Sequence, residues 1–146
     1  MAQQAHRYDT TVEWTGELRG KLSAPKRPTV SIGTPPEFGG TDDVWSPEHL
    51  CVAAVNACIM ATFLAIAANS KLRFSKYSAT AIGTLEQVDE ESGPVISRIV
   101  VKPRLVIGPD VDRARAERIL RLVGERCYVS NSMTSEVTLE PEIVVE

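Results

Sequence analysis

The sequence contains few cysteines, histidines and aromatic residues, and these shortages exclude several classes of protein. There are three cysteines and two histidines among 146 residues. Three is an odd number and too small for a disulfide scaffold. A structural zinc site needs four cysteine or histidine ligands, usually in close pairs, and no close cysteine pair occurs. We therefore expect no metal site and no bound cofactor.

Strong net charge and an export signal are also lacking. The formal net charge is −3, whereas nucleic-acid-binding proteins usually have a basic face, so no nucleic-acid partner is expected. Residues 1–10 have neither the apolar core nor the cleavage site of a secretory signal. We therefore expect a cytoplasmic protein whose cysteines stay reduced.

One long apolar run, residues 50–68, has the length of a membrane span. It contains Asn56 and Thr62 and is rich in alanine, so we expect a helix buried in protein and no membrane contact. Because the run is apolar nearly all the way round, this helix should be the central element of the fold. Ser46 suits its N-cap and Pro47 its first position.

The remaining pattern indicates an α+β fold in a single domain, residues 1–146. The composition, 43% hydrophobic and 24% charged, is ordinary for one globular domain of this length. The expected elements are strands within residues 8–40, the central helix to about 69, a β-hairpin of 74–88 and 95–107, a helix capped by Asp110 or Asp112, and a last strand over 136–145.

The three cysteines allow both a packing and a chemical interpretation. Cys58 lies in the middle of the expected central helix, and Cys127 lies at the end of the second helix, in phase with its apolar stripe. Buried free cysteines commonly pack as small hydrophobic residues. Cys51 and Cys58 are about 10 Å apart along a helix axis, and a disulfide needs Cα atoms within about 7 Å. Cys51 is therefore interpreted as a packing residue.

Three segments carry a family resemblance. They are Ser46-Pro-Glu-His-Leu50, the small-residue helix that reaches Cys58 ten residues after Glu48, and Cys127-Tyr-Val-Ser-Asn-Ser132. Together they resemble the OsmC/Ohr family, the osmotically inducible and organic-hydroperoxide-resistance proteins, over nearly the whole chain. The resemblance implies an OsmC-like fold with N-terminal antiparallel strands, a long buried central helix, a β-hairpin, a second helix and a final strand. It also implies an intertwined homodimer with active sites at the subunit interface.

The resemblance further implies a cysteine-based peroxidase that reduces organic hydroperoxides. By position, Cys58 would be the attacking thiol and Cys127 the resolving thiol. Glu48 matches the glutamate at the start of the central helix, and Arg19 is the candidate for the arginine that precedes it. Two departures, His49 for a typical glutamine and Tyr128 for a common proline, are consistent with a general OsmC-like member.

Simple electrostatics limits how this expected site could work. The dipole of a helix fades within its first turn, and Cys58 lies about eleven residues into the helix, so another positive charge is needed. Arg19 fits because an arginine stays charged. Glu48 lies about 15 Å from Cys58 along one straight helix, so it should orient the arginine or act from the partner subunit. The alternatives are a solvated surface role for Arg19 and first-turn helix stabilisation by Glu48.

The sequence therefore predicts a dimeric thiol peroxidase for alkyl or lipid hydroperoxides, with a role in the response to oxidative stress. Attack by Cys58 would give a sulfenic acid, and condensation with Cys127 would give a disulfide. An external dithiol, with lipoyl compounds among the candidates, would reduce that disulfide. The alternative is an OsmC-like dimer that binds a small ligand or senses redox state without significant peroxidase turnover.

Overall fold

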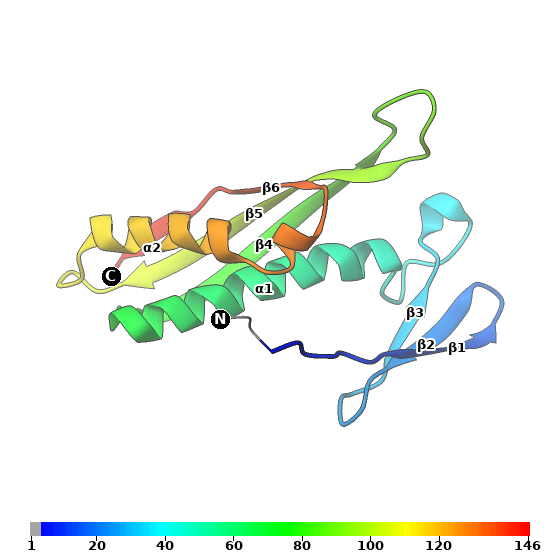
Figure 1. The fold of residues 1–146 in the computed structure, drawn as a ribbon, viewed down its shortest axis with the longest axis horizontal. Coiled ribbons are helices and arrows are strands. Elements are labelled where there is room, and N and C mark those ends of the chain that lie inside the picture. The colour runs from blue at the N-terminus through cyan, green and yellow to red at the C-terminus, as the bar shows by residue number, and fades with distance from the viewer. Residues whose placement is uncertain (1–3) are drawn as a thin grey trace. The chain divides into compact units, whose positions relative to one another are not determined.

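The computed structural model describes residues 4–146 (Figure 1). Met1–Leu50 and Cys51–Glu146 form two compact units. The strands are β1 (Thr11–Gly16), β2 (Arg19–Ser23), β3 (Val30–Gly33), β4 (Lys76–Glu86), β5 (Val95–Ile107), β6 (Glu136–Leu139) and β7 (Glu142–Val145). The helices are α1 (Pro47–Ser70) and α2 (Arg113–Arg126), with short 3-10 turns at Pro36–Phe38 and Ser130–Ser132.

The first unit is built on a three-stranded antiparallel sheet in the order β1–β2–β3. Leu22 of β2 pairs with Val12 on one side and with Val30 on the other. The tight turn from β1 to β2 needs a positive φ of 123° at Gly16, a conformation that glycine adopts without steric cost. The strands expected within residues 8–40 are therefore present.

The second unit is a two-layer arrangement in which α1 and α2 run along one sheet (Figure 1). β5 pairs with β4 in antiparallel and with β6 and β7 in parallel orientation. Lys102 and Arg104 of β5 are exposed on the other face of the sheet. The β5 residues that alternate with them are buried: Ile99, Val101, Pro103, Leu105 and Ile107. Burial thus alternates with a period of two along β5, as expected for a sheet that is covered on one face only. The two helices together with these sheets confirm the predicted α+β class.

Both ends of α1 are fixed by local hydrogen bonds. Ser46 Oγ accepts the backbone N–H of His49 at 3.1 Å, which is the predicted N-cap. At the other end Lys71 adopts a φ of 55°, and the N–H of Leu72 donates to the carbonyl of Ala67 at 2.9 Å. This is the Schellman arrangement, which stops a helix by satisfying its last carbonyls.

Only one stripe of α1 is buried within the described chain. Its members recur every four residues and are at most 2% exposed: Val55, Ile59, Phe63 and Ala67. Other faces of the helix carry exposed apolar side chains: Ala54, Ala57, Met60, Ala61, Leu64, Ala65 and Ala68. The mean hydropathy of 2.3 would also suit a membrane span, but a single such helix is weak evidence, because core helices of soluble proteins share this property. The expected burial is thus found on one side, and an apolar face remains uncovered.

α2 has the predicted cap and the predicted core stripe. The Asp112 side chain accepts the N–H groups of Ala114 and Arg115 at 3.0 and 3.4 Å. The buried stripe consists of Ala116, Ile119, Leu120 and Val123. Cys127 follows at the C-cap and is fully buried.

The prediction of one strand over residues 136–145 is wrong, because the structure divides it into β6 and β7. β6 pairs with residues 98–101 of β5, and β7 pairs with residues 104–107. Between these ladders Pro141 lies at the level of Pro103. Neither proline has a backbone N–H to donate, so the ladder is interrupted where they meet.

The close approach of α1 to β4 depends on the missing side chain of Gly83. A Cβ at this position would lie 2.4 Å from Cγ2 of Val52, whose branched side chain has little freedom to move. We predict that Gly83→Ala lowers the free energy of unfolding by about 1–3 kcal/mol. Denaturant unfolding measures this change. Gly93→Ala is the control, because its Cβ would meet nothing within 4 Å, and equal stability of the two variants would contradict the packing described.

Candidate active site

Cys58 lies in the middle of α1 and is partly buried. Its Sγ is 3.9 Å from Oγ1 of Thr62, one helical turn later. The same hydroxyl can donate its one proton instead to the backbone carbonyl of Cys58, 2.8 Å away. Residues four apart are neighbours on one helix face, so α1 itself supplies a polar neighbour for the thiol.

Cys127 approaches from the end of α2. Its backbone, with φ −71° and ψ 114°, leaves the helix and leads at once into a second turn. The N–H of Asn131 closes that turn by donating to the carbonyl of Cys127 at 3.0 Å. The backbone amides of Val129 and Tyr128, at the start of the turn, help to lower the pKa of the Cys58 thiol by hydrogen bonding.

The pKa values of the two thiols move in opposite directions, because each thiol acts on the other. Burial raises the pKa of Cys58, but hydrogen bonds from the Cys127 thiol, the Val129 and Tyr128 amides and Thr62 outweigh it, so the pKa falls below the ordinary value. Burial also raises the pKa of Cys127, and its hydrogen bond to Cys58 raises it further. Cys58 is therefore the more readily ionised of the two thiols.

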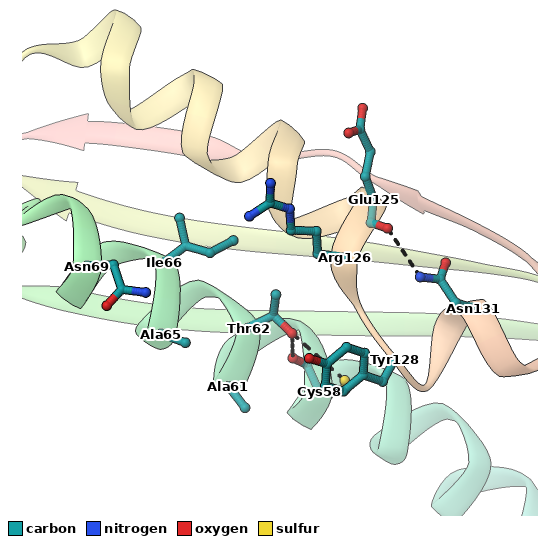
Figure 2. Close-up of a pocket in the computed structure, with 10 residues that line it drawn as sticks. All are labelled: Cys58, Ala61, Thr62, Ala65, Ile66, Asn69, Glu125, Arg126, Tyr128 and Asn131. Carbon is teal, nitrogen blue, oxygen red and sulfur yellow. Dashed lines mark hydrogen bonds between the residues drawn. The ribbon is translucent and has the colours of Figure 1, made fainter. Parts of the chain in front are cut away.

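A cavity of about 620 Å³ opens beside Cys58 (Figure 2). The α1 residues that line it are spaced by three or four and share one face: Cys58, Ala61, Thr62, Ala65, Ile66 and Asn69. The opposite wall comes from the end of α2 and the turn after it: Glu125, Arg126, Tyr128 and Asn131. This volume lies in the range of small-molecule sites, roughly 300–1,000 Å³. The partly apolar lining suits an alkyl group better than hydrogen peroxide.

Arg19 is held by groups of the first unit. Its guanidinium donates to Asp43 Oδ1 at 2.7 Å and to Thr41 Oγ1 at 3.2 Å. Hydrogen bonds from Thr41 and Arg19 lower the pKa of the Asp43 carboxyl. Asp43 is therefore the carboxylate partner of Arg19 in this unit. No hydrogen bond or ion pair joins Arg19 to Glu48 within residues 4–146, and their expected joint role stays a prediction.

Glu48 lies in the first turn of α1, as expected. Its Oε1 atom is buried and has no hydrogen-bond partner within residues 4–146. Burying a carboxylate oxygen without a hydrogen-bond donor destabilises the folded state, so a donor beside Glu48 Oε1 would be stabilising. Arg19 and Glu48 belong to the first unit, and the two thiols belong to the second.

Sequence reasoning missed the neutral donors around Cys58. It required a positive charge, whereas the second unit supplies a thiol, a hydroxyl and two backbone amides. Thr62 could have been found, because a threonine four residues after the candidate cysteine shares its helix face. The Tyr128 and Val129 amides could not, since residue type says nothing about where a backbone N–H points. Cys51 is a half-buried free thiol two turns before Cys58, and nothing described here gives it a chemical role.

Comparison with known proteins gives a consistent result. The family model "OsmC-like protein" matches residues 40–142. The chain belongs to this family. An organic hydroperoxide resistance protein from Xanthomonas axonopodis pv. citri is 29% identical over 129 residues, which cover 84% of each sequence.

Solved structures of the family share the fold of this chain. An OsmC-like protein of unknown function from Vibrio cholerae superimposes with a TM-score of 0.86 at 20% identity, over 94% of this chain and 99% of that one. An organic hydroperoxide resistance protein from Elizabethkingia anophelis gives a TM-score of 0.76 at 18% identity, over 99% and 100% of the two chains. The predicted OsmC-like fold is therefore confirmed.

We predict that removal of either side-chain donor raises the pKa of Cys58. Thr62→Val and Cys127→Ala should each raise it, because each removes one hydrogen-bond donor to the thiolate. Since only the thiolate reacts, alkylation of Cys58 near neutral pH should slow accordingly. The measurement is the pH dependence of iodoacetamide alkylation, with peptide mapping to separate the cysteines. Cys51→Ser is the control and should leave the pKa of Cys58 unchanged. If Thr62→Val and Cys127→Ala also leave that pKa unchanged, Thr62 and Cys127 are not donors to the Cys58 thiolate.

Proposed function

We propose that this protein is a thiol peroxidase that reduces organic hydroperoxides. The observation that carries the proposal is a pair of neighbouring free thiols at one end of a small-molecule cavity, in which the pKa of Cys58 is lowered and the pKa of Cys127 is raised. The name of the Xanthomonas relative, organic hydroperoxide resistance protein, supports the same substrate class.

In the first step the Cys58 thiolate attacks the outer oxygen of the hydroperoxide. A sulfur–oxygen bond forms, the oxygen–oxygen bond breaks, and an alkoxide leaves, which takes up a proton to become the alcohol. Cys58 is oxidised to a sulfenic acid, and the peroxide is reduced. The neighbouring Cys127 thiol can supply this proton.

In the second step Cys127 attacks the sulfenic sulfur of Cys58. A disulfide forms, and the hydroxyl group leaves with a proton as water. The buried Cys127 is suited to this later role, because its raised pKa keeps it protonated while Cys58 reacts. An external dithiol then reduces the disulfide by two exchange reactions and becomes a disulfide itself. The cycle uses no bound cofactor.

Arg19 and Glu48 are proposed to tune the reactive thiolate. The unpartnered Oε1 of Glu48 needs a donor, and the guanidinium of Arg19 has the planar fork that serves a carboxylate and a thiolate together. Because Asp43 holds Arg19 in the first unit, release from Asp43 would precede this role.

If Arg19 takes this role, Arg19→Gln raises the pKa of Cys58 and slows peroxide reduction. Asp43→Asn should have the opposite effect, because it removes the carboxylate that competes for the arginine. Both variants are measured by the same alkylation titration and by single-turnover peroxide reduction. If Arg19→Gln leaves the pKa of Cys58 unchanged, Arg19 is a solvated surface residue and does not tune the thiolate.

A homodimer is proposed as the working form. The uncovered apolar face of α1, centred on Leu64 and the alanines around it, supports burial against a second copy. Sedimentation equilibrium should give twice the 15.9 kDa mass of the chain, and Leu64→Glu should shift the measured mass toward that of one chain.

We also propose that residues 1–146 act as one cytoplasmic OsmC-like domain, for which a single cooperative unfolding transition is expected.

The decisive experiment compares peroxide consumption by wild type, Cys58→Ser and Cys127→Ser with a dithiol reductant. Cys58→Ser should lose at least about 1,000-fold in rate, because it removes the nucleophile. In Cys127→Ser, one turnover should leave Cys58 as sulfenic or sulfinic acid, whereas the wild type should form the Cys58–Cys127 disulfide. Mass spectrometry distinguishes these products.

Each alternative has its own outcome in this experiment. Equal rates for wild type and Cys58→Ser would exclude the enzyme and favour ligand binding. Rapid disulfide formation with negligible turnover would instead indicate a redox sensor. A disulfide that contains Cys51 would overturn the role given to Cys127.

A further inference from the structure

Cys127 is the most enclosed of the three thiols. Its side chain is fully buried, whereas Cys51 and Cys58 are partly exposed. Water stabilises a thiolate by donating hydrogen bonds to the sulfur, and a buried thiolate loses those bonds. The fold must therefore supply donors of its own if Cys127 is to react as a thiolate.

Ser130 supplies such donors. It is the first residue of the 3-10 turn Ser130–Ser132, three residues after Cys127, and its Oγ donates to the backbone carbonyl of Cys127 at 3.1 Å. The hydroxyl and the backbone N–H of Ser130 both favour the ionised form of Cys127 by hydrogen bonding. They thus oppose the effect of burial, which raises the pKa of this thiol.

The hydroxyl of Ser130 can change its acceptor at little cost. It carries a single proton, which the Cys127 carbonyl accepts in the reduced protein. The same carbonyl accepts the N–H of Asn131 at 3.0 Å, so it keeps a partner when the hydroxyl turns away. The proton of Ser130 is therefore available to a thiolate at Cys127, and no carbonyl is left without a donor.

Oxidation of Cys58 removes one of the effects that keep Cys127 protonated. In the reduced site the pKa of Cys127 is raised first by burial and then by the hydrogen bond and the charge of Cys58. Once Cys58 is a sulfenic acid, its sulfur no longer carries the thiolate charge. The ionisable side chains next to Cys127 in the chain are exposed to solvent: Glu125, Arg126 and Tyr128. The donors of Ser130 then act without opposition from Cys58.

We propose that Ser130 is a further catalytic residue, whose hydroxyl turns from the Cys127 carbonyl to the Cys127 sulfur and stabilises the resolving thiolate. The inference rests on the proposed peroxidase function and assigns a residue to its second step. Cys127 gives up its proton, and its thiolate forms the sulfur–sulfur bond while the sulfur–oxygen bond at Cys58 breaks. The departing hydroxide takes up a proton to become water. Ser130 keeps its own proton throughout.

The test separates the two steps in a single turnover with one equivalent of cumene hydroperoxide. Rapid quenching and mass spectrometry follow the sulfenic acid at Cys58 and its conversion to the disulfide. Ser130→Ala should form the sulfenic acid at the wild-type rate and form the disulfide about two- to fivefold more slowly near neutral pH. With excess peroxide, the longer-lived sulfenic acid should give more sulfinic acid by a similar factor.

Ser132→Ala is the matched control. Ser132 lies in the same 3-10 turn, and its Oγ donates to the carbonyl of Tyr128 at 2.7 Å, so this variant removes an equivalent bond from the turn. It should leave both steps at their wild-type rates. Ser130→Thr retains the hydroxyl and should form the disulfide at nearly the wild-type rate. Equal slowing in Ser130→Ala and Ser132→Ala would show that the rigidity of the turn controls the rate, and would overturn the proposal.

The pH dependence distinguishes a hydroxyl that stabilises a thiolate from one that only packs. Loss of the donor raises the pKa of Cys127, so the slowing in Ser130→Ala should be largest below that pKa, where the thiolate is scarce. At high pH, where Cys127 is ionised in both proteins, the two rates of disulfide formation should converge. A slowing of the same size at every pH would overturn the role given to Ser130.

A titration without peroxide separates this inference from the proposed function. In the Cys51→Ser, Cys58→Ser double variant, Cys127 is the one thiol of the chain, and the ultraviolet absorbance of the thiolate follows its ionisation. Adding Ser130→Ala should raise the pKa of Cys127, and adding Ser132→Ala should leave it unchanged. The expected shift supports Ser130 as a donor even if the wild type reduces no peroxide. An unchanged pKa, in a protein that reduces peroxides through Cys58, overturns the role of Ser130 alone.

Discussion

The packing of one helical stripe sets the chemistry of the second unit. Val55, Ile59 and Phe63 lock α1 onto the covered face of the sheet, and this fixes the rotation of the helix about its axis. Cys58 and Thr62, one residue before Ile59 and Phe63, then lie on the side that faces the end of α2. A rotation of α1 by one residue, about 100°, would carry the thiol away from Cys127 and from the Tyr128 and Val129 amides. The pKa order of the thiols is therefore a consequence of core packing.

The site shows how neutral hydrogen-bond donors can favour a thiolate. Burial opposes ionisation of Cys58, yet several neutral donors converge on the sulfur and reverse the balance. One donor, the Cys127 thiol, is also the group that would react next. The contact that lowers the pKa of the first cysteine thus holds the second in place, so activation and resolution share one geometry.

The parts of the fold that depend on periodicity and capping could be predicted from the sequence. The bounds of β5, the Ser46 and Asp112 caps and the stripe of α2 all follow from local patterns. The division between β6 and β7 was missed, although Pro141 is visible in the sequence, because its effect depends on Pro103 in a strand some forty residues away. The Tyr128 and Val129 amides were missed for a similar reason, since only the tertiary fold directs them at Cys58. Arg19 was identified by type, but its partner Asp43 could only be found in the folded unit.

The proline break has a consequence for the sheet of the second unit as a whole. On the β6–β7 side the row of backbone donors and acceptors is interrupted, and such breaks discourage another strand from pairing along an edge. The opposite edge is β4, eleven residues long and without a proline. Any strand that extends this sheet, from another part of the chain or from another molecule, is therefore expected to add beside β4. The two edges of this sheet therefore differ in how readily they pair with a further strand.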